Sequence, residues 1–418
     1  MAKRRLHKEA WVALALTGLY YAAEALCQIW VSVYFWVNSL DFSVICRHYM
    51  AQYLVTPVVF ILAGWYSQAR DRAHVYRIGL VLHAAFYATL LILQEKSVDY
   101  AVPLGALMGV TWGMFWPGAQ TFNYDVTVAG EREYYYGLLQ VVTGTVRLVA
   151  PLVGALIIAS AADKLVGYHV VFGVALVLYG GALVLSFKVP RDSTPRPFRF
   201  RRAIFPGKEQ RDWRLILLAS GTLGGAYHVF AFLLGLIMYM QTEEEWSVGA
   251  FASFQAIVGI GMAYVLARTI RPGRRRKVMF WGTMVAMAAG MMVSWKLTVV
   301  TLVIFGFMRR VGQAMFGIPH VSLRMDIISA NVEEPAQRIE YICAWEVPLA
   351  IGRVLTLLLV GGLYAAFEDK AFALRLALLI LCCSRLLSYL LVAQTSQLRA
   401  EKQAGVSAPH PPTAVDSG

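Results

Sequence analysis

Two pairs of arginines repeat in the two halves of this chain. Arg132 and Arg147 stand 15 residues apart, and Arg338 and Arg353 keep that spacing 206 residues later in a chain of 418. The second arginine of each pair lies inside an apolar stretch. Inserting an arginine into the hydrocarbon core of a membrane costs at least roughly 2.5–3.5 kcal/mol, so such a residue usually has a polar partner or a functional role. Because a guanidinium grips carboxylate or phosphate as a fork, Arg147 and Arg353 are candidates for binding an anionic group.

A second group of charges contains Arg309, Arg310 and Glu346, again within apolar stretches. Adjacent residues of a helix point about 100° apart, so only one of the two arginines can face a shared cavity squarely. We expect Glu346 to be the partner of the other. Glu346 also lies about 10 Å from Arg353 on one helix face. These two pair directly only if both side chains reach; otherwise a bound ligand or another helix bridges them.

Three ionisable residues in apolar stretches, Glu24, Glu346 and His228, are candidates for proton coupling. A carboxylate is costly in hydrocarbon, and protonation removes its charge. Gln28 follows Glu24 by one helical turn on the same face, which makes it a candidate for substrate binding. Histidine titrates near neutral pH and could join a relay. The alternatives are that Glu24 is the static partner of a buried arginine and that His228 is a hydrogen-bonded core residue.

Trp112 and Trp116 lie one helical turn apart and could stack on a flat or cationic ligand, although aromatic packing is the commoner role. Arginines outnumber carboxylates across the apolar stretches. In a water-filled cavity this balance favours anionic or zwitterionic solutes.

The elements that must position these residues are membrane-spanning helices. Hydrophobic residues make up 58% of the chain, charged residues 15%, and the mean hydropathy is +0.57. A soluble domain carries more charge. The apolar residues fall into twelve blocks of about the 20-residue length that crosses a bilayer as a helix. The blocks are roughly 10–37, 46–66, 75–94, 100–122, 134–159, 166–187, 214–240, 248–268, 278–295, 297–318, 339–366 and 370–394.

The net charge of +13 comes from basic residues whose distribution along the chain indicates membrane topology. With the N-terminus inside, most Lys and Arg fall in or beside cytoplasmic segments, while outer loops carry acidic residues such as Glu243, Glu244, Glu245, Glu368 and Asp369. This pattern predicts a multi-pass plasma (inner) membrane protein with both termini cytoplasmic, and gives no reason to expect nucleic acid. The five cysteines have no metal-ligand or redox spacing, so we expect no metal and no cofactor.

A basic, proline-rich segment at 188–213 divides the chain into halves of six predicted spans each, 1–187 and 214–395. We expect this segment to be a cytoplasmic linker, and 396–418 to be a disordered cytoplasmic tail. The predicted fold class is all-α integral membrane, with twelve transmembrane helices in two pseudo-symmetric six-helix bundles. In this frame Arg147 and Arg353 occupy equivalent places in the fifth and eleventh spans.

Two loops resemble a motif of the major facilitator superfamily. That motif reads roughly Gly-x-x-x-Asp-Arg-x-Gly-Arg-Arg between the second and third helices. The residues that match or lie in it, in the loops of the two halves, are Gly64, Asp71, Arg72, Gly273 and Arg274. The aspartate position of the family holds Gln68 in the first loop and Ile270 in the second, which is a departure at the residue to which the family assigns a gating role.

Polar residues beside two further loops are expected to act in gating or as structural anchors of the cytoplasmic loops. Asp125 with Arg132, and Asp326 with Arg338, are predicted to form ion pairs or loop contacts at the cytoplasmic side. The resemblance further implies that the first and fourth helices line a midplane cavity, and that the fifth and eleventh helices form contacts between the halves. The alternative for Arg147 and Arg353 is therefore that they hold the gate instead of the substrate.

The predicted function is secondary transport of a small anionic or zwitterionic solute by alternating access, coupled to protons, in a monomer surrounded by membrane lipid. Pro151 and Gly154 faintly resemble the glycine-proline motif of the drug antiporters of the family, which favours export. The alternatives are multidrug efflux of lipophilic compounds, and a non-transporting protein, lipid scramblase-like or an assembly factor, that reuses the fold. The sequence contains no nucleophile-base constellation that would predict an enzyme. It also contains no Gly-x-x-x-x-Gly-Lys-Ser/Thr loop that would predict ATP binding.

Overall fold

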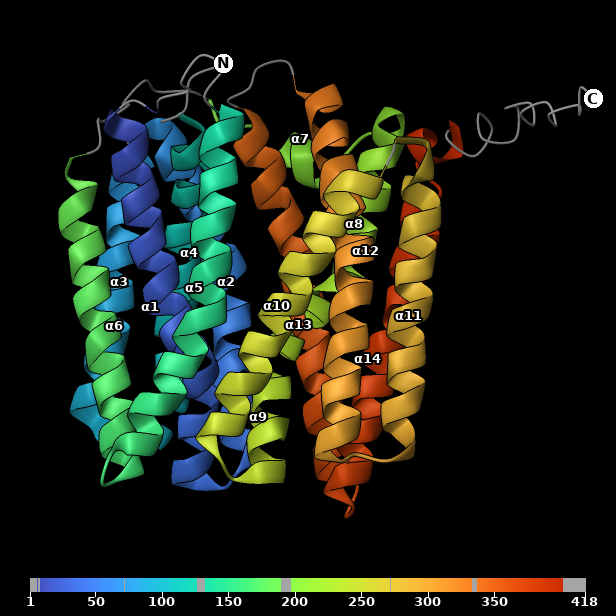
Figure 1. Cartoon of the computed structure of the whole chain (residues 1–418). Helices are drawn as coiled ribbons and strands as arrows, with labels where there is room; N and C mark the ends of the chain where they lie inside the picture. Colours follow the sequence, from blue (N-terminus) through green and yellow to red (C-terminus); the bar gives the residue numbers. More distant parts are fainter. Residues whose placement is uncertain are drawn as a thin grey trace, which may run out of the picture.

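The computed structural model describes residues 6, 8–70, 72–125, 132–188, 197–270, 272–332 and 337–400 (Figure 1). At 72, 120–125, 132, 133, 226 and 272 it describes the main chain alone. These residues are helical almost throughout, and strands are absent from them.

The helices fall into two groups separated by two short elements, α7 (Phe200–Ile204) and η2 (Lys208–Gln210). The first group contains α1 (Lys8–Ser39), α2 (Phe42–Ala69), α3 (Arg72–Leu93), η1 (Gln94–Val98), α4 (Ala101–Asp125), α5 (Arg132–Ser160) and α6 (Lys164–Ser186). The second contains α8 (Arg211–Gly224), η3 (Gly225–Val229), α9 (Phe230–Thr242), α10 (Glu245–Thr269), η4 (Pro272–Arg274), α11 (Arg275–Trp295), α12 (Val299–Asn331), α13 (Arg338–Ala366) and α14 (Lys370–Val392).

Twelve long helical segments of the described chain can cross a membrane. Eleven are both long and apolar enough, and α4, with 25 residues, is the twelfth. At 1.5 Å per residue, a helix of that length exceeds the ~30 Å hydrocarbon core. The seventh crossing is the continuous run of α8, η3 and α9. The prediction of an all-helical membrane protein is therefore confirmed.

One predicted boundary is wrong by several turns. The apolar block at 297–318 predicted the tenth helix to end near 318, whereas α12 continues to Asn331. Its last turns carry polar residues that a hydropathy pattern does not report as helix. The other predicted ends lie within a few residues of the observed ones.

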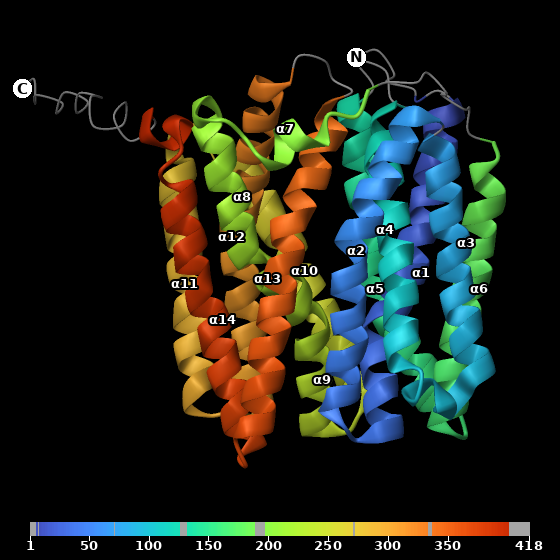
Figure 2. The ribbon, with the colours of Figure 1, turned by 180° about the vertical axis from the view of Figure 1, so that it is seen from behind.

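The two groups form separate bundles that lie side by side (Figures 1 and 2). They meet along α5 with α10, α2 with α13, and α1 with α9. Within the first bundle α2 packs extensively on α4, because glycines permit close contact: a Cβ on Gly109 would lie 2.7 Å from the Gln52 carbonyl oxygen. The counterpart pair of the second bundle, α10 and α12, packs less extensively.

The bundles are closed against each other at one end. We call the end that holds Lys8 and Ala400 the termini end (top of Figure 1), and the opposite end the far end. At the far end the Phe42 ring of α2 lies 4.6 Å from the Tyr364 ring of α13, measured between centroids. One turn or two further in, the Tyr49 ring of α2 stacks on the Phe232 ring of α9 at 3.9 Å.

The segments expected to be irregular are partly ordered against the second bundle. In the linker, Trp213 Nε1 donates to the Ala203 carbonyl at 2.7 Å, and the main-chain N–H of Arg199 donates to the Glu340 carboxylate at 2.6 Å. The predicted disordered tail begins too early, because residues 396–400 are helical and the Ser396 N–H donates to the Asp212 carboxylate. Residues 401–418 lie outside the described part.

Candidate functional site

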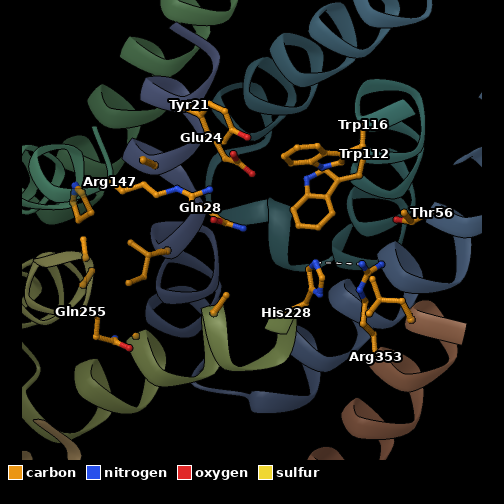
Figure 3. Close-up of a pocket in the computed structure, with 18 of the residues that line it drawn as sticks. Tyr21, Glu24, Gln28, Thr56, Trp112, Trp116, Arg147, His228, Gln255 and Arg353 are labelled. Carbon is orange, nitrogen blue, oxygen red and sulfur yellow. Dashed lines mark hydrogen bonds between the residues drawn. The ribbon is translucent and has the colours of Figure 1, made fainter. Parts of the chain in front are cut away.

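The two bundles enclose a cavity of about 480 Å³, the central cavity. It lies between α1, α2, α4 and α5 on one side and η3, α9, α10, α12 and α13 on the other. All ten residues that the sequence assigned to substrate binding or proton coupling line it: Glu24, Gln28, Trp112, Trp116, Arg147, His228, Arg309, Arg310, Glu346 and Arg353. Figure 3 shows several of them pointing into the same space from both bundles.

Arg353 is held by two groups at once. Its guanidinium donates to the two Glu346 carboxylate oxygens at 2.5 and 3.4 Å, so the direct pair that the spacing left open is formed. Arg353 Nη2 also donates to His228 Nε2 at 3.2 Å. A guanidinium has only donors, so this bond requires a neutral imidazole with its proton on Nδ1. The same guanidinium lies over the Tyr53 ring of the other bundle, 5.7 Å from its centroid.

Arg309 and Arg310 are bound by amides. Arg309 donates to Gln255 Oε1 at 2.7 Å and to Gln313 Oε1 at 3.0 Å, and Arg310 donates to Gln313 Oε1 at 3.3 Å. The prediction that Glu346 pairs with one of these arginines is therefore wrong, because Arg353 on the same helix already occupies its carboxylate. Amide oxygens satisfy the hydrogen bonds of the arginines but leave their charge uncompensated.

Glu24, Gln28 and Arg147 lie close to one another on the first bundle's side of the cavity (Figure 3). Arg147 lies over the Tyr21 ring, 5.3 Å from its centroid. Among the residues that the structure describes, the Glu24 carboxylate has neither a hydrogen bond nor an ion pair. The alternative of a static arginine partner would place a guanidinium within ion-pair distance of Glu24, and none of the described arginines is there.

Trp112 and Trp116 combine cavity lining with packing. Both are half-buried and line the central cavity. The Trp112 ring lies edge-on to the His228 imidazole, with centroids 6.0 Å apart, and thereby contacts the opposite bundle. The aromatic pair thus reaches the Arg353 network as well as the cavity.

These positions fit a known family. A family model described as Major Facilitator Superfamily matches residues 13–337. The chain belongs to this superfamily. The curated relative "Uncharacterized protein YqgE" of Bacillus subtilis (strain 168) is 27% identical over 367 residues, covering 88% of this chain and 85% of that protein.

Solved structures of the superfamily share the fold. The crystal structure of an auto-inhibited POT family peptide transporter superposes with a TM-score of 0.73 at 11% identity, covering 93% of this chain and 97% of that one. The human organic anion transporter MFSD10 (TETRAN) superposes with a TM-score of 0.65 at 14% identity, covering 94% and 100%. At these identities the likeness concerns the fold alone.

One glycine of the superfamily motif lies at a close contact between the bundles. A Cβ on Gly64 of α2 would overlap the Cys343 sulfur of α13 and lie 3.6 Å from the Phe198 ring of the linker. Cys343 Sγ also donates to the Phe60 carbonyl at 3.7 Å. The small residue therefore lets α2, α13 and the linker approach at the termini end.

The remaining gating predictions have mixed outcomes. Asp326 is bound by Arg275 Nη1 at 2.9 Å, while Arg338 donates to the Ser329 hydroxyl at 3.5 Å. The structure thus gives Asp326 a partner on α11, the close neighbour of α12, where the sequence predicted Arg338. Gly273 and Arg274 lie in η4 at the same end. Asp71 lies outside the described residues, and only the main chain is described for Arg72, Asp125 and Arg132.

The sequence did not predict the amides that hold the arginines. Gln255 and Gln313 are uncharged, so they barely interrupt an apolar pattern, although a glutamine in a spanning helix is itself a signal of a polar contact. The sequence pattern also does not predict η3, the π-helical turn that contains His228. Such turns are often found at functional sites, but their sequence signature is weak.

Proposed function

We propose that this member of the superfamily is a secondary active transporter that moves an anionic or zwitterionic solute together with protons. The charge of the central cavity carries this proposal: its described lining holds four arginines against two glutamates. Of these arginines, Arg353 has a carboxylate partner, whereas Arg147, Arg309 and Arg310 have none among the described residues. A cationic cavity with apolar walls concentrates anions, and guanidinium forks bind carboxylate or phosphate.

The proposed coupling follows from the same charges. Protonation of Glu346 would release the Arg353 guanidinium to an anion, and protonation of Glu24 would remove the negative charge nearest Arg147. Proton and anion then bind together, so the coupling is cotransport. This departs from the export that the glycine-proline pattern favoured, because an inward proton gradient drives a cotransported anion inward.

We place the termini end in the cytoplasm and the protein in the plasma membrane. The support is the distribution of basic residues, which favours cytoplasmic loops at that end. In this orientation the far end, where aromatic contacts join the bundles, faces the outside. Alternating access then requires the contacts at the far end to break.

The test is transport into proteoliposomes that hold a pH-sensitive dye. Radiolabelled monocarboxylates, dicarboxylates, inorganic phosphate and amino acids are offered with and without an inward proton gradient. We expect one class to accumulate with the gradient and to acidify the lumen. Gradient-insensitive entry of lipophilic cations in its place would favour multidrug transport. No solute or proton movement at all would overturn the transporter proposal.

Glu24→Gln tests the proton step. It should abolish solute-dependent acidification while leaving thermal unfolding unchanged, because Glu24 has no described partner to lose. Glu95→Gln, an exposed glutamate of η1 at the far end, is the matched control and should retain acidification. Full acidification in Glu24→Gln would remove Glu24 from the proposal and leave anion binding standing.

A further inference from the structure

A second large cavity, the side cavity, lies within the second bundle between α10 and α12. Its volume is about 580 Å³, and it shares Arg310, His228 and Trp345 with the central cavity, so the two adjoin. Small residues line it, with Gly259 and Ala263 on α10 and Gly317 on α12.

The side cavity exists because α10 and α12 are in contact at the far end and separate toward the termini end. Near the far end Phe251 fills the space at Gly306, where a Cβ would lie 2.6 Å from its ring. One turn further along α10, Gln255 binds Arg309. Beyond that level, Gly259 and Ala263 of α10 face Gly317 and Val321 of α12 across the side cavity.

The polar atoms that line the side cavity include donors that lack acceptors. Arg324 lies over the Trp345 ring, with its guanidinium carbon 3.8 Å from the ring centroid. Arg324 Nε and Trp345 Nε1 are both buried and without a hydrogen-bond partner. Arg324 has no hydrogen bond or ion pair with any residue that the structure describes. Neither group can accept a hydrogen bond, so the pair is complementary to an oxygen anion.

The walls of the side cavity are suited to an apolar chain. Its rim includes Ile318 and Val321, whose side chains are 39% and 45% exposed on a membrane-spanning helix. Arg324 follows Arg310 by 14 residues, about 21 Å along the helix axis, which places it toward the membrane surface at the termini end. Between them α12 lines the cavity mostly with apolar and small residues, and also with Gln313 and His320. A head group at Arg324 would therefore leave a tail directed toward mid-membrane, as in a lipid leaflet.

We propose that the side cavity binds an amphipathic anion, whose charged group lies at Arg324 and Trp345 and whose apolar chain lies between α10 and α12. The site gives such a molecule a lateral route to the central cavity, because both cavities share Arg310. That it delivers a transported solute rests on the proposed function, whereas binding itself does not.

The test uses brominated probes, which quench tryptophan emission on contact. Purified full-length protein in phosphatidylcholine nanodiscs receives increasing amounts of 2-bromostearate, or of phosphatidylglycerol brominated at the second carbon of each chain, so that the bromine lies next to the head group. Phosphatidylcholine with the same brominated chains gives the baseline. We expect saturable quenching by an anionic probe above that baseline, and its loss in Trp345→Phe, which removes the emitting ring. Which anionic probe saturates distinguishes a free carboxylate from a lipid head group.

Arginine variants test the head-group contact. Arg324→Gln should raise the half-saturation concentration of the probe about tenfold, which is the loss of affinity expected for one charge-assisted hydrogen bond. Arg324→Lys keeps the charge without the planar fork, so its half-saturation concentration should lie between those of the wild type and Arg324→Gln. The matched control is Arg268→Gln, which removes an arginine stacked on Tyr264 at 4.3 Å, near the same end but outside the side cavity.

Two outcomes would overturn the site. Quenching by the anionic probes that stays at the phosphatidylcholine baseline shows that no anion is selected. Equal half-saturation in Arg324→Gln, Arg268→Gln and the wild type shows that Arg324 does not hold the head group. Because these readouts measure binding in nanodiscs, they stand apart from the vesicle assay of transport, and either proposal can fail alone.

Discussion

The Arg353 guanidinium joins an acid, an imidazole and an aromatic ring of the opposite bundle. Arg353 is 2% exposed and Glu346 is 5% exposed, so the pair is buried. A buried ion pair contributes little net stability, but removing one partner leaves an uncompensated charge. We therefore expect the pair to act in specificity and switching, and its contributions to stability and to transport to be separable by mutation.

Arg353→Met should lower the free energy of unfolding by about 3–5 kcal/mol, because it leaves the Glu346 charge buried alone. Arg353→Met combined with Glu346→Leu should regain most of that stability without regaining anion transport. Thermal unfolding in detergent and vesicle uptake measure the two effects separately. A double variant as unstable as the single one would show that Arg353 acts mainly through packing.

A second residue-scale effect concerns the far end, where Asp41 caps α2. Its carboxylate accepts from the Ser43 hydroxyl at 2.6 Å and the Ser43 N–H at 2.8 Å. These bonds hold the pKa of Asp41 below its ordinary value. The folded pKa is the lower one, so this stabilisation is present above the unfolded pKa of about 3.9 and is lost as the pH falls through the folded pKa.

Asp41→Ala should therefore cost about 0.5–2 kcal/mol at pH 7, and the difference from the wild type should shrink in acid below about pH 4. Thermal unfolding at pH 7 and pH 3.5 measures both values. Asp41→Asn, which keeps a capping oxygen without the charge, should be close to the wild type at both. A gap for Asp41→Ala that persists unchanged in acid would assign the cost to another cause.

At the scale of elements, the seventh crossing is shaped by close packing on α13. The π-helical turn η3 places His228 beside Arg353, and glycines of α8 bring the two helices together. A Cβ on Gly224 would lie 2.8 Å from the Arg353 main-chain N, with no flexible side chain in between to move. The position of His228 thus depends on a glycine contact about one turn before it.

Gly224→Ala should push α8 from α13, weaken the bond of His228 to Arg353 and raise the KM for the transported anion by about tenfold. Gly221→Ala is the control one turn earlier on the same helix, where a Cβ would meet the Pro348 carbonyl oxygen at an ordinary 3.6 Å. We expect that variant to bind and unfold like the wild type. Equal KM values for both alanine variants would remove the glycine contact from the site.

The elements themselves were largely predictable from the sequence, and their contacts were not. Twelve apolar blocks were enough to place the helices, since a bilayer fixes their length. Charged residues in those blocks, such as Glu24 and Arg147, predicted the cavity lining because hydrocarbon tolerates them only at a polar interior. Which acid meets which arginine depends on side-chain reach and helix rotation, so the partners of Glu346 and Asp326 came only from the structure. The side cavity is space that α10 and α12 do not fill, and no pattern of residues in the sequence predicts it.

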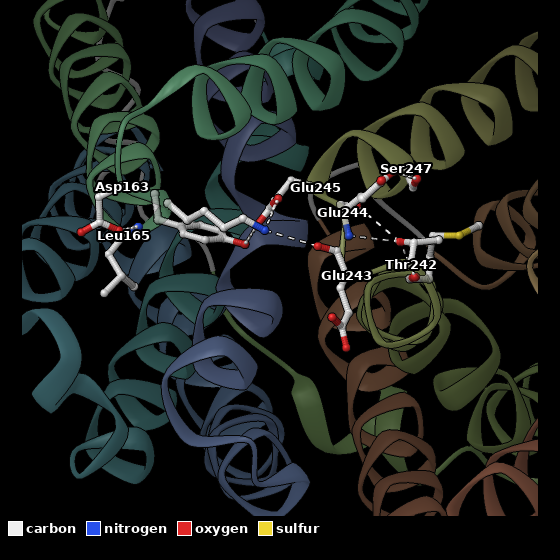
Figure 4. Close-up of polar contacts among 10 residues, drawn as sticks. Asp163, Leu165, Thr242, Glu243, Glu244, Glu245 and Ser247 are labelled. Atoms are coloured by element: carbon white, nitrogen blue, oxygen red, sulfur yellow. Dashed lines mark hydrogen bonds and ion pairs between the residues drawn. The ribbon is translucent and has the colours of Figure 1, made fainter.

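For the whole molecule, the far end carries an ion pair between the bundles (Figure 4). Lys164 Nζ of α6 lies 3.1 Å from Glu245 Oε2 of α10, and donates to the Glu243 carbonyl at 3.3 Å. Tyr168 donates to the same Glu245 carboxylate at 3.3 Å. The Glu245 side chain is 3% exposed and the Lys164 side chain is 52% exposed, so solvent screens this contact from the lysine side only. It joins the first bundle to the second where alternating access must separate them.

Glu245→Gln should shift the population of conformers toward an open far end. Spin labels at Ser160 and Glu368, exposed far-end positions on the two bundles, report this change as a longer distance in pulsed electron resonance. Glu244→Gln, the neighbouring glutamate without this ion pair, is the control. An unchanged distance distribution in Glu245→Gln would show that the aromatic contacts at Phe42 and Tyr49 hold the far end closed without the ion pair.

The uneven packing of equivalent helices has a mechanical consequence. Because α2 packs closely on the glycines of α4 while α10 packs less extensively on α12, we expect the first bundle to be stiffer and the second to bend more easily within itself. We call the first bundle the frame and the second bundle the arm. Backbone amides in the termini-side half of α10 should exchange with deuterium faster than those of α2. The arm, rather than the frame, should then set the rate at which the central cavity opens to the other side of the membrane.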